Sequence, residues 1–461
     1  MSLSSDFQIE SIIYLLNDVL LPLTDIILYP THVFMFVNPL LSEELFQHIW
    51  AFRLFKQDHL ATTSGEPVQI LYPGLHNHHG GPDFSAAKIR IGATLWVGQV
   101  ELHLRTSDWF RHGHQHNMQY GRIILHVVFV HDMPADRIPG VACLELQQYI
   151  PKLLLQRYEQ LRQLAPFVPC APHVAMVPQL TWLSWKERLL AERWERKMTA
   201  LRAWLQSNQY NWEEVCYWAV AQSYGMPVNA LPLLQVAQSL PQVILMRHRH
   251  QGMQLEALLF GQAGMLEAPH ADVYALQLQE IYFHLRHKYK LLPMAPHTWN
   301  WLRMRPAAFP TMRLATFAAL LQHSTHLFSR ILEATEVSAL EQLFFVQPSA
   351  YWHTHYRFGQ PVRNTHRPGK QAVHGILINT VLPLLFLYGQ QKNLKYYQEK
   401  ALHFLQQLPP EKNSIINSWA ELGVTHESAM ESQALLQLKQ YYCDEKKCLH
   451  CAIGVKILSG I

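Results

Sequence analysis

Two acidic residues and a histidine near the start of the chain have the types and spacing of a divalent-metal site. Asp83 follows Gly81-Pro82, and Glu101 and His103 come after the next predicted hairpin. Because Glu101 and His103 are two residues apart on a predicted strand, their side chains share one face of a sheet. Carboxylates that converge from neighbouring strands can bind Mg²⁺ or Mn²⁺, which polarises a phosphoryl oxygen and activates water. We therefore predict Asp83 and Glu101 as metal ligands, and His103 as a ligand or a water-orienting group.

Histidines flank these three residues on both sides in the sequence. Three precede Asp83 and three follow Ser107-Asp108-Trp109: His76, His78, His79, His112, His114 and His116. Clustered histidines can bind zinc, so a zinc hydrolase built on the loop histidines is an alternative. Loop histidines are more often solvated or in contact with substrate. We expect Asn77, Asp108, His112 and His114 to lie around the predicted site, close to substrate or behind the metal ligands.

The same residues have a simpler interpretation as parts of an ordinary strand and turn. Gln99, Glu101, His103 and Arg105 alternate with apolar residues, as on a strand with one face in solvent. Asp83 would then be a turn residue without a chemical role. The sequence leaves this alternative open beside the metal site.

Cysteines form a second candidate site at the other end of the chain. Cys443, Cys448 and Cys451 are separated by four and two residues, a spacing that allows three thiolates to bind one metal. Cys170, in a proline-rich linker, is the best candidate for the fourth ligand, with His450 and Cys216 behind it. We predict a structural zinc or iron–sulfur site, and thiols that bind nothing are the alternative.

The composition describes a globular protein of more than one domain. The chain has 461 residues, of which 49% are hydrophobic, and a formal net charge of +4. That charge permits a phosphate-bearing partner and excludes little. The six cysteines do not have the pattern of a disulfide scaffold, which favours a reducing cytosol. Charged residues and prolines interrupt the apolar residues 1–40, so we predict an N-terminal extension there and no membrane span.

The elements that must position the first site are predicted over residues 41–150. Ser42 precedes an amphipathic helix, and strands are expected at 67–71, 86–91 and 95–104. A polar segment runs from Ser107 to Tyr120, and a fully buried strand is expected at 122–130. This order predicts a compact α/β module.

The chain from residue 151 to residue 461 has the pattern of a mainly helical domain, so the fold class is α+β. Long amphipathic runs are predicted as helices at 182–205, 212–224, 315–334 and 394–408. Arginines lie among aromatic residues from Arg303 to Arg313 and again from Tyr356 to Lys370. Such segments can bind a nucleic-acid backbone and stack on bases, but they are more often solvated helix ends.

Pro82-Asp83, a hairpin and Glu101-x-His103, within this order of elements, resemble the signature of the PD-(D/E)xK nuclease superfamily. The resemblance implies a restriction-endonuclease-like mixed sheet flanked by helices and Mg²⁺- or Mn²⁺-dependent hydrolysis of DNA or RNA. His103 stands where that family has lysine, and Lys88 is the candidate substitute. A non-catalytic nucleic-acid-binding or assembly protein on a degenerate nuclease fold is the alternative. The cysteine arrangement resembles, in outline, the iron–sulfur staple of helicase–nucleases of this superfamily.

Six stretches carry a wider resemblance: His48 to Phe55, Gly81 to Phe84, Val100 to His103, Ser107 to Trp109, Arg303 to Arg313 and Cys443 to Gly454. With them the chain resembles a bacterial family catalogued as domain of unknown function 2851. That resemblance implies a bacterial cytoplasmic protein and supplies no activity.

Overall fold

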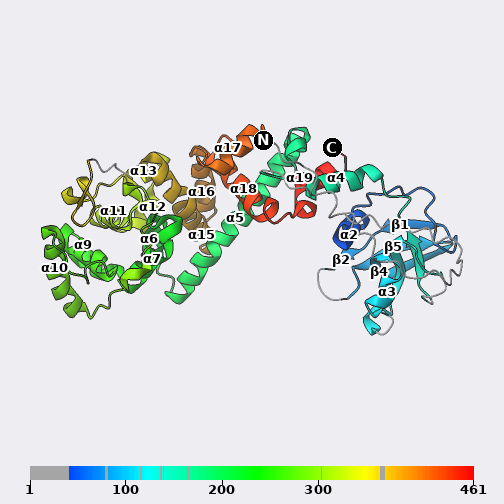
Figure 1. Cartoon of the computed structure of the whole chain (residues 1–461), viewed down its shortest axis with the longest axis horizontal. Coiled ribbons are helices and arrows are strands. Elements are labelled where there is room, and N and C mark those ends of the chain that lie inside the picture. The colour runs from blue at the N-terminus through cyan, green and yellow to red at the C-terminus, as the bar shows by residue number, and fades with distance from the viewer. Residues whose placement is uncertain are drawn as a thin grey trace, which may run out of the picture. The chain divides into compact units, whose positions relative to one another are not determined.

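A computed structural model describes residues 41–77, 81–114, 117–134, 138, 140–162, 167–302, 304–363 and 369–460. The predicted extension of residues 1–40, the histidines His78, His79 and His116, Arg303 and residues 364–368 lie outside the described residues. The chain divides into two compact units, Met1–Pro151 and Lys152–Ile461 (Figure 1). The class is α+β, as the sequence predicts, with a mixed sheet in unit 1 and helices in unit 2.

The sheet of unit 1 combines antiparallel and parallel pairs. Its strands are β1 (Val68–Tyr72), β2 (Leu75–His76), β3 (Phe84–Ile91), β4 (Thr94–Arg105), β5 (Ile123–Val130) and β6 (Ala142–Glu145). They are ordered β1-β3-β4-β5-β6, and β2 pairs with the start of β3. The pairs β1–β3 and β3–β4 are antiparallel, whereas β4–β5 and β5–β6 are parallel. The four predicted strands correspond to β1, β3, β4 and β5.

Helix α2 (Glu43–Ala51) covers one face of this sheet. The Ser42 hydroxyl accepts the Leu45 N–H at 3.2 Å and caps the helix, as its sequence predicts. Leu45, Phe46 and Trp50 of this helix are fully buried, and the Phe46 ring meets Phe129 of β5 edge to face at 6.2 Å. Because side chains alternate along a strand, this apolar face includes Val100, Leu102 and Val127, whereas Glu101 and His103 point to the opposite face.

The connection between β4 and β5 lies over the face opposite α2. Parallel neighbours cannot be joined by a hairpin, so residues 106–122 must cross the sheet. They contain the single-turn helix α3 (Asp108–Arg111) and the 3₁₀ turn η2 (Met118–Tyr120). This crossing places His112 and His114 above Glu101 and His103.

Unit 2 is built from helices around a large apolar core. The helices are α4 (Lys152–Arg162), α5 (Gln179–Ser207), α6 (Trp212–Tyr224), α7 (Met226–Ser239), α8 (Gln242–His248), α9 (Gly252–Gln262), α10 (Val273–Tyr289), α11 (Pro310–His323), α12 (Leu327–Glu333), α13 (Val337–Phe344), α14 (Lys370–Ile376), α15 (Leu382–Gln391), α16 (Lys395–Gln407), α17 (Ser414–Glu421), α18 (Ala429–Leu438) and α19 (Ala452–Leu458). A short hairpin, β7 (His355–Arg357) with β8 (Gln360–Pro361), interrupts them. The predicted runs 182–205, 212–224 and 394–408 correspond to α5, α6 and α16.

The prediction of one helix over 315–334 is wrong, because the chain breaks between α11 and α12. His326 adopts a left-handed backbone conformation with φ of 50°. The Glu213 carboxylate accepts the backbone N–H groups of Phe328 and Ser329, each at 3.1 Å, and satisfies the start of α12. Both helices bury apolar residues in the same core, so the hydrophobic pattern continues across the break.

One helical segment of the described residues, Lys370–Gln391, is long and apolar enough to cross a membrane by length and composition. Of its most apolar window, 61% is buried inside the protein. The segment includes α14, a π-helical turn η8 (Leu377–Val381) and α15. Core helices of helical domains meet the same test.

Candidate metal centre

Asp83 and Glu101 meet where the loop before β3 passes the middle of β4. The backbone N–H of Asp83 donates to Oε2 of Glu101 at 3.0 Å. The backbone N–H of Leu102 donates in return to Oδ2 of Asp83 at 2.9 Å, and Gln47 of α2 donates to Oδ1 at 2.8 Å. The two predicted ligands are therefore neighbours, and Glu101 keeps its second oxygen, Oε1, for other partners.

The turn before Asp83 is shaped by glycine and by Asn77. Gly81 has a φ of 109°, a conformation that favours glycine, and it allows the chain to turn into Pro82-Asp83. The Asn77 backbone N–H donates to the Asp83 carbonyl at 2.7 Å, and its side-chain amide donates to the Pro82 carbonyl at 3.1 Å. Asn77 thus lies beside the predicted site, where it holds the turn.

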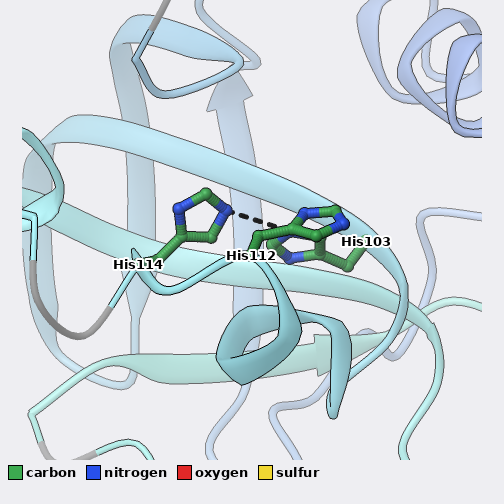
Figure 2. A group of neighbouring side chains, drawn as sticks. All are labelled: His103, His112 and His114. Atoms are coloured by element: carbon green, nitrogen blue, oxygen red, sulfur yellow. Dashed lines mark hydrogen bonds between the residues drawn. The ribbon is translucent and has the colours of Figure 1, made fainter.

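Three imidazoles converge beside Glu101, and their rings are shown in Figure 2. Nε2 of His103 lies 3.1 Å from Nδ1 of His112 and 3.3 Å from Nε2 of His114. One nitrogen from each ring falls within 4.8 Å of the other two. Oε1 of Glu101 lies 3.3 Å from Nε2 of His114 and 3.8 Å from Nε2 of His103. Three nitrogens and one carboxylate oxygen therefore face a common point.

His126 on β5 completes the cluster from behind. It is opposite Glu101 in the parallel register, and its Nε2 lies 2.9 Å from Nδ1 of His103. If Nδ1 of His103 carries the proton, that proton is donated to His126 and the lone pair of Nε2 points toward His112 and His114. This is the tautomer that a metal ligand needs, with its other ring nitrogen held by a neighbour.

Burial excludes the interpretation of β4 as a strand with one face in solvent. Glu101 is 5% exposed and His103 is 1% exposed, whereas the first four residues of β4 are exposed. The strand is therefore covered on both faces only where it carries the site. His112 is exposed and His114 is half-buried, so the cluster opens to solvent on the side of the crossing segment.

The two carboxyl groups hold protons more tightly than usual. Burial raises the pKa of Glu101 to about 8, and the nearby Asp83 carboxylate adds to this shift. Burial also raises the pKa of Asp83 to about 6, against the hydrogen bond from Leu102. Two carboxylates that share a buried site repel one another, and a bound cation relieves that repulsion.

The buried histidines are shifted in the opposite sense. Burial lowers the pKa of His103 to about 2, and repulsion from the surrounding imidazoles contributes. Burial likewise lowers the pKa of His126 to about 3 and lowers the pKa of His114. These rings are neutral at pH 7, and neutral imidazole is the form that binds metals.

Two other predicted residues lie apart from the converging nitrogens. Asp108 is buried at the start of α3, where it accepts the Arg105 backbone N–H at 3.0 Å and pairs with Arg111 at 3.1 Å. Lys88 is exposed and opposite Val97 on β4, on the same face as Glu101. Four residues along a strand correspond to roughly 13 Å. Lys88 is therefore too far along the sheet to act as an ammonium group at Glu101.

Sequence reasoning missed three residues of the site. His126 lies within the apolar run of β5, where a single histidine was the available signal. The Tyr120 ring stacks on His114 with centroids 3.9 Å apart, and burial beside Glu101 and Asp83 raises its pKa to about 12. Gln47 lies between apolar residues of α2, and nothing in the neighbouring sequence indicates its contact with Asp83.

Replacing Glu101 with Gln should change how the stability of chelator-treated protein depends on pH. The ordinary pKa of Glu101 is 4.5 and its folded value is about 8, so the stability that its proton provides is lost as pH rises through about 8. His103 and His126 are neutral in folded and unfolded protein above about pH 7. Thermal unfolding followed between about pH 7 and 9 should show a steeper decline for the wild type than for Glu101→Gln. Parallel profiles would contradict the proposed environment of Glu101.

A family model described as protein of unknown function (DUF2851) matches residues 43–414, most of the chain. Neither the curated proteins nor the solved structures contain a match.

Proposed function

We propose that this chain, which belongs to the DUF2851 family, binds a divalent transition metal and hydrolyses phosphodiester bonds in DNA or RNA. The observation that carries the proposal is the convergence of three imidazole nitrogens within 4.8 Å of one another. Oε1 of Glu101 lies 3.3 Å from His114 and would supply a negative oxygen ligand once a cation displaces the proton of this carboxyl group. His103 and Glu101 are buried while His112 is exposed, so the cluster has a buried base and is open to solvent, as a site that takes up an ion needs to be.

The chemistry of the ligands selects among metals. Imidazole nitrogen suits Zn²⁺ and other late transition metals, whereas carboxylate oxygen suits Mg²⁺ and Mn²⁺. A mixed set of His103, His112, His114 and Glu101 favours Zn²⁺ or Mn²⁺ over Mg²⁺, which prefers an all-oxygen shell. Asp83 as a direct ligand stays a prediction, since both of its oxygens already accept hydrogen bonds.

Beyond binding the metal, residues of this chain can position the ligands that hydrolysis requires. A bound metal polarises a phosphoryl oxygen and lowers the pKa of its water. The Asp83 backbone N–H holds one oxygen of Glu101 and directs the other toward His114. The Asp83 carboxylate accepts hydrogen bonds from Gln47 and Leu102, so Asp83 contributes by positioning Glu101.

The part of the sheet where β1, β3 and β4 are exposed is suited to bind a long, charged substrate. Tyr72, Lys88 and Val97 are opposite one another on β1, β3 and β4, and all three are exposed on the face that carries Glu101. An aromatic ring beside an ammonium group can stack a base and neutralise a phosphate. We therefore assign Lys88 to substrate binding instead of catalysis.

The proposal also includes a relationship of unit 1 to the PD-(D/E)xK nuclease superfamily. The order of helix, strands, crossing segment and strand supports it, and so does the Asp83–Glu101 pair. The position of Lys88 favours the second candidate function, a non-catalytic nucleic-acid-binding or assembly protein on a degenerate nuclease fold. Metal binding separates the two functions.

Titration calorimetry with chelator-treated protein tests the metal centre. We expect one Mn²⁺, a metal that thiolates do not favour, to bind in unit 1. His112→Ala should weaken this binding by roughly tenfold to a hundredfold, since one exposed ligand is lost. His131→Ala is the matched control, because His131 is half-buried nearby and bonds to Thr106 at 2.8 Å. Absence of metal binding in a protein that still binds nucleic acid would establish the non-catalytic function instead.

A further inference from the structure

Cys170 lies close to three cysteines of the C-terminal segment in unit 2, although it is far from them in the sequence. Cys170 precedes the 3₁₀ turn η4 (Ala171–Met176), Cys443 ends the π-helical turn η9 (Lys439–Cys443), and Cys448 and Cys451 flank the 3₁₀ turn η10 (Cys448–His450). The Lys439 ammonium lies 5.4 Å from the centre of the Phe167 ring, so the segment before Cys170 runs beside η9. Turn η10 packs on both η9 and α19.

The four thiols are close enough to influence one another. None of them is in a disulfide, Cys170 is 8% exposed and Cys451 is 6% exposed. Burial raises the pKa of Cys170 to about 12, and Cys451 and Cys448 add to that shift. Burial also raises the pKa of Cys443, with contributions from all three other thiols. Thiols in such surroundings stay protonated until a cation replaces their protons.

The groups around Cys451 are arranged to stabilise a sulfur anion. Burial raises the pKa of Cys451 to about 11, and hydrogen bonds from the backbone N–H groups of Gly454 and Ile453 oppose this shift. The Trp185 indole N–H is near enough to the Cys451 sulfur to lower this pKa. This N–H is buried and has no well-formed hydrogen bond to any described residue. A buried N–H without an acceptor is costly, and a metal-bound thiolate or sulfide would be a strong acceptor for it.

We propose that Cys170, Cys443, Cys448 and Cys451 bind one metal centre that ties the segment before α5 to the C-terminal segment of unit 2. The ligand chemistry suits either zinc or an iron–sulfur cluster. The centre would stabilise unit 2 by closing a long loop of chain. It stands independently of the metal site in unit 1, because the two sites share no residue.

The spacing of the sulfurs favours the iron–sulfur cluster. Zn–S bonds of about 2.3 Å place tetrahedral thiolates roughly 3.8 Å apart. Among the described residues, three histidine nitrogens of unit 1 lie within 4.8 Å of one another, whereas no three cysteine sulfurs do. An inorganic core bound between the four thiolates would account for a wider spacing.

Metal analysis of the full chain, purified without oxygen, tests this centre. We expect stoichiometric iron with matching acid-labile sulfide and visible absorption, all retained in His112→Ala and lost in Cys448→Ser. Cys216→Ser is the matched control, since Cys216 is fully buried in α6 away from the cluster. Zinc in place of iron, with the same response to the variants, would keep the four-thiolate centre and overturn the cluster. Folded wild type without either metal, or metal content equal in Cys448→Ser, would overturn the proposal.

If Cys448→Ser does not fold, alkylation of the cysteine thiols in the wild-type protein tests the centre instead. In the proposed centre, four of the six cysteines react only after the metal has been removed by chelation or oxidation. Equal labelling before and after metal removal would contradict the centre.

Gly454→Ala offers a way to disturb the centre without removing a thiol. A Cβ at Gly454 would lie 2.2 Å from the Cys448 carbonyl oxygen, so α19 would have to move away from η10. We expect metal content to fall by roughly tenfold, as when a residue that orients a ligand is lost. Gly375→Ala is the control, because a Cβ there meets nothing within 4 Å. Equal metal content in the two variants would contradict the role of Gly454.

Discussion

Glu101→Ala should reduce metal-dependent cleavage of nucleic acid by about a hundredfold to ten-thousandfold, the range for losing a group that acts in the chemical step. The substitution removes the carboxyl group that lies 3.3 Å from His114 and 3.8 Å from His103, so the proposed metal and its water would lose an anchor. The measurement is cleavage of labelled single-stranded and double-stranded DNA and RNA with Mn²⁺ or Zn²⁺. Circular dichroism establishes that the variant is folded.

Two further variants show whether this loss is specific to the site. Asp83→Ala should lower the rate less than Glu101→Ala if Asp83 positions Glu101 through its backbone N–H, because that group survives the substitution. Lys88→Ala should weaken substrate binding with little change in the rate at saturating substrate, since Lys88 lies along the sheet from Glu101. Cleavage that is unchanged by Glu101→Ala and Asp83→Ala would sink the proposed activity.

His103→Lys should abolish metal binding at the histidine cluster of unit 1 and, with it, cleavage. Nε2 of His103 is the nitrogen that contacts both His112 and His114, so the substitution removes the central ligand. It also buries a positive charge at a position that is 1% exposed, next to the rings of His126 and His112. A cation placed there repels the metal that the remaining ligands would bind.

The same substitution distinguishes the histidine centre from a PD-(D/E)xK site. Lysine is the residue of that superfamily at this position, so a nuclease of that type should keep or gain Mg²⁺-dependent cleavage in His103→Lys. Titration calorimetry and cleavage assays on the variant, with His131→Lys as a control for an added charge nearby, separate the two mechanisms. Active, Mg²⁺-dependent His103→Lys protein would refute the histidine centre.

Local patterns in the sequence were sufficient for the elements that carry the carboxylates. The Ser42 cap and the apolar positions after it predicted α2, and alternation predicted β3 and β4. The hairpin predicted that Asp83 and Glu101 lie close together, because antiparallel neighbours bring such residues together, and a bulge between Phe84 and Ala87 sets the exact register. These features depend on residues close in sequence, where caps, turns and side-chain period act directly.

The histidine centre depended on tertiary structure. Alternation places Glu101 and His103 on one face but does not say what covers that face. The parallel pairing of β4 with β5 puts His126 opposite Glu101, and it requires the chain between them to cross above the sheet. That crossing brings His112, His114 and Tyr120 to the carboxylate.

Burial on both faces of β4 was also decided by the fold, and it determines the chemistry of the site. The sequence pattern of a strand with one polar face is the same whether that face lies in water or beneath a crossing segment. The sequence by itself therefore determined which residues carry the acids and where the strands lie. Only the tertiary packing around β4 decided that burial raises the pKa of Glu101 to about 8 and lowers the pKa of His103, because desolvation acts through neighbours distant in sequence.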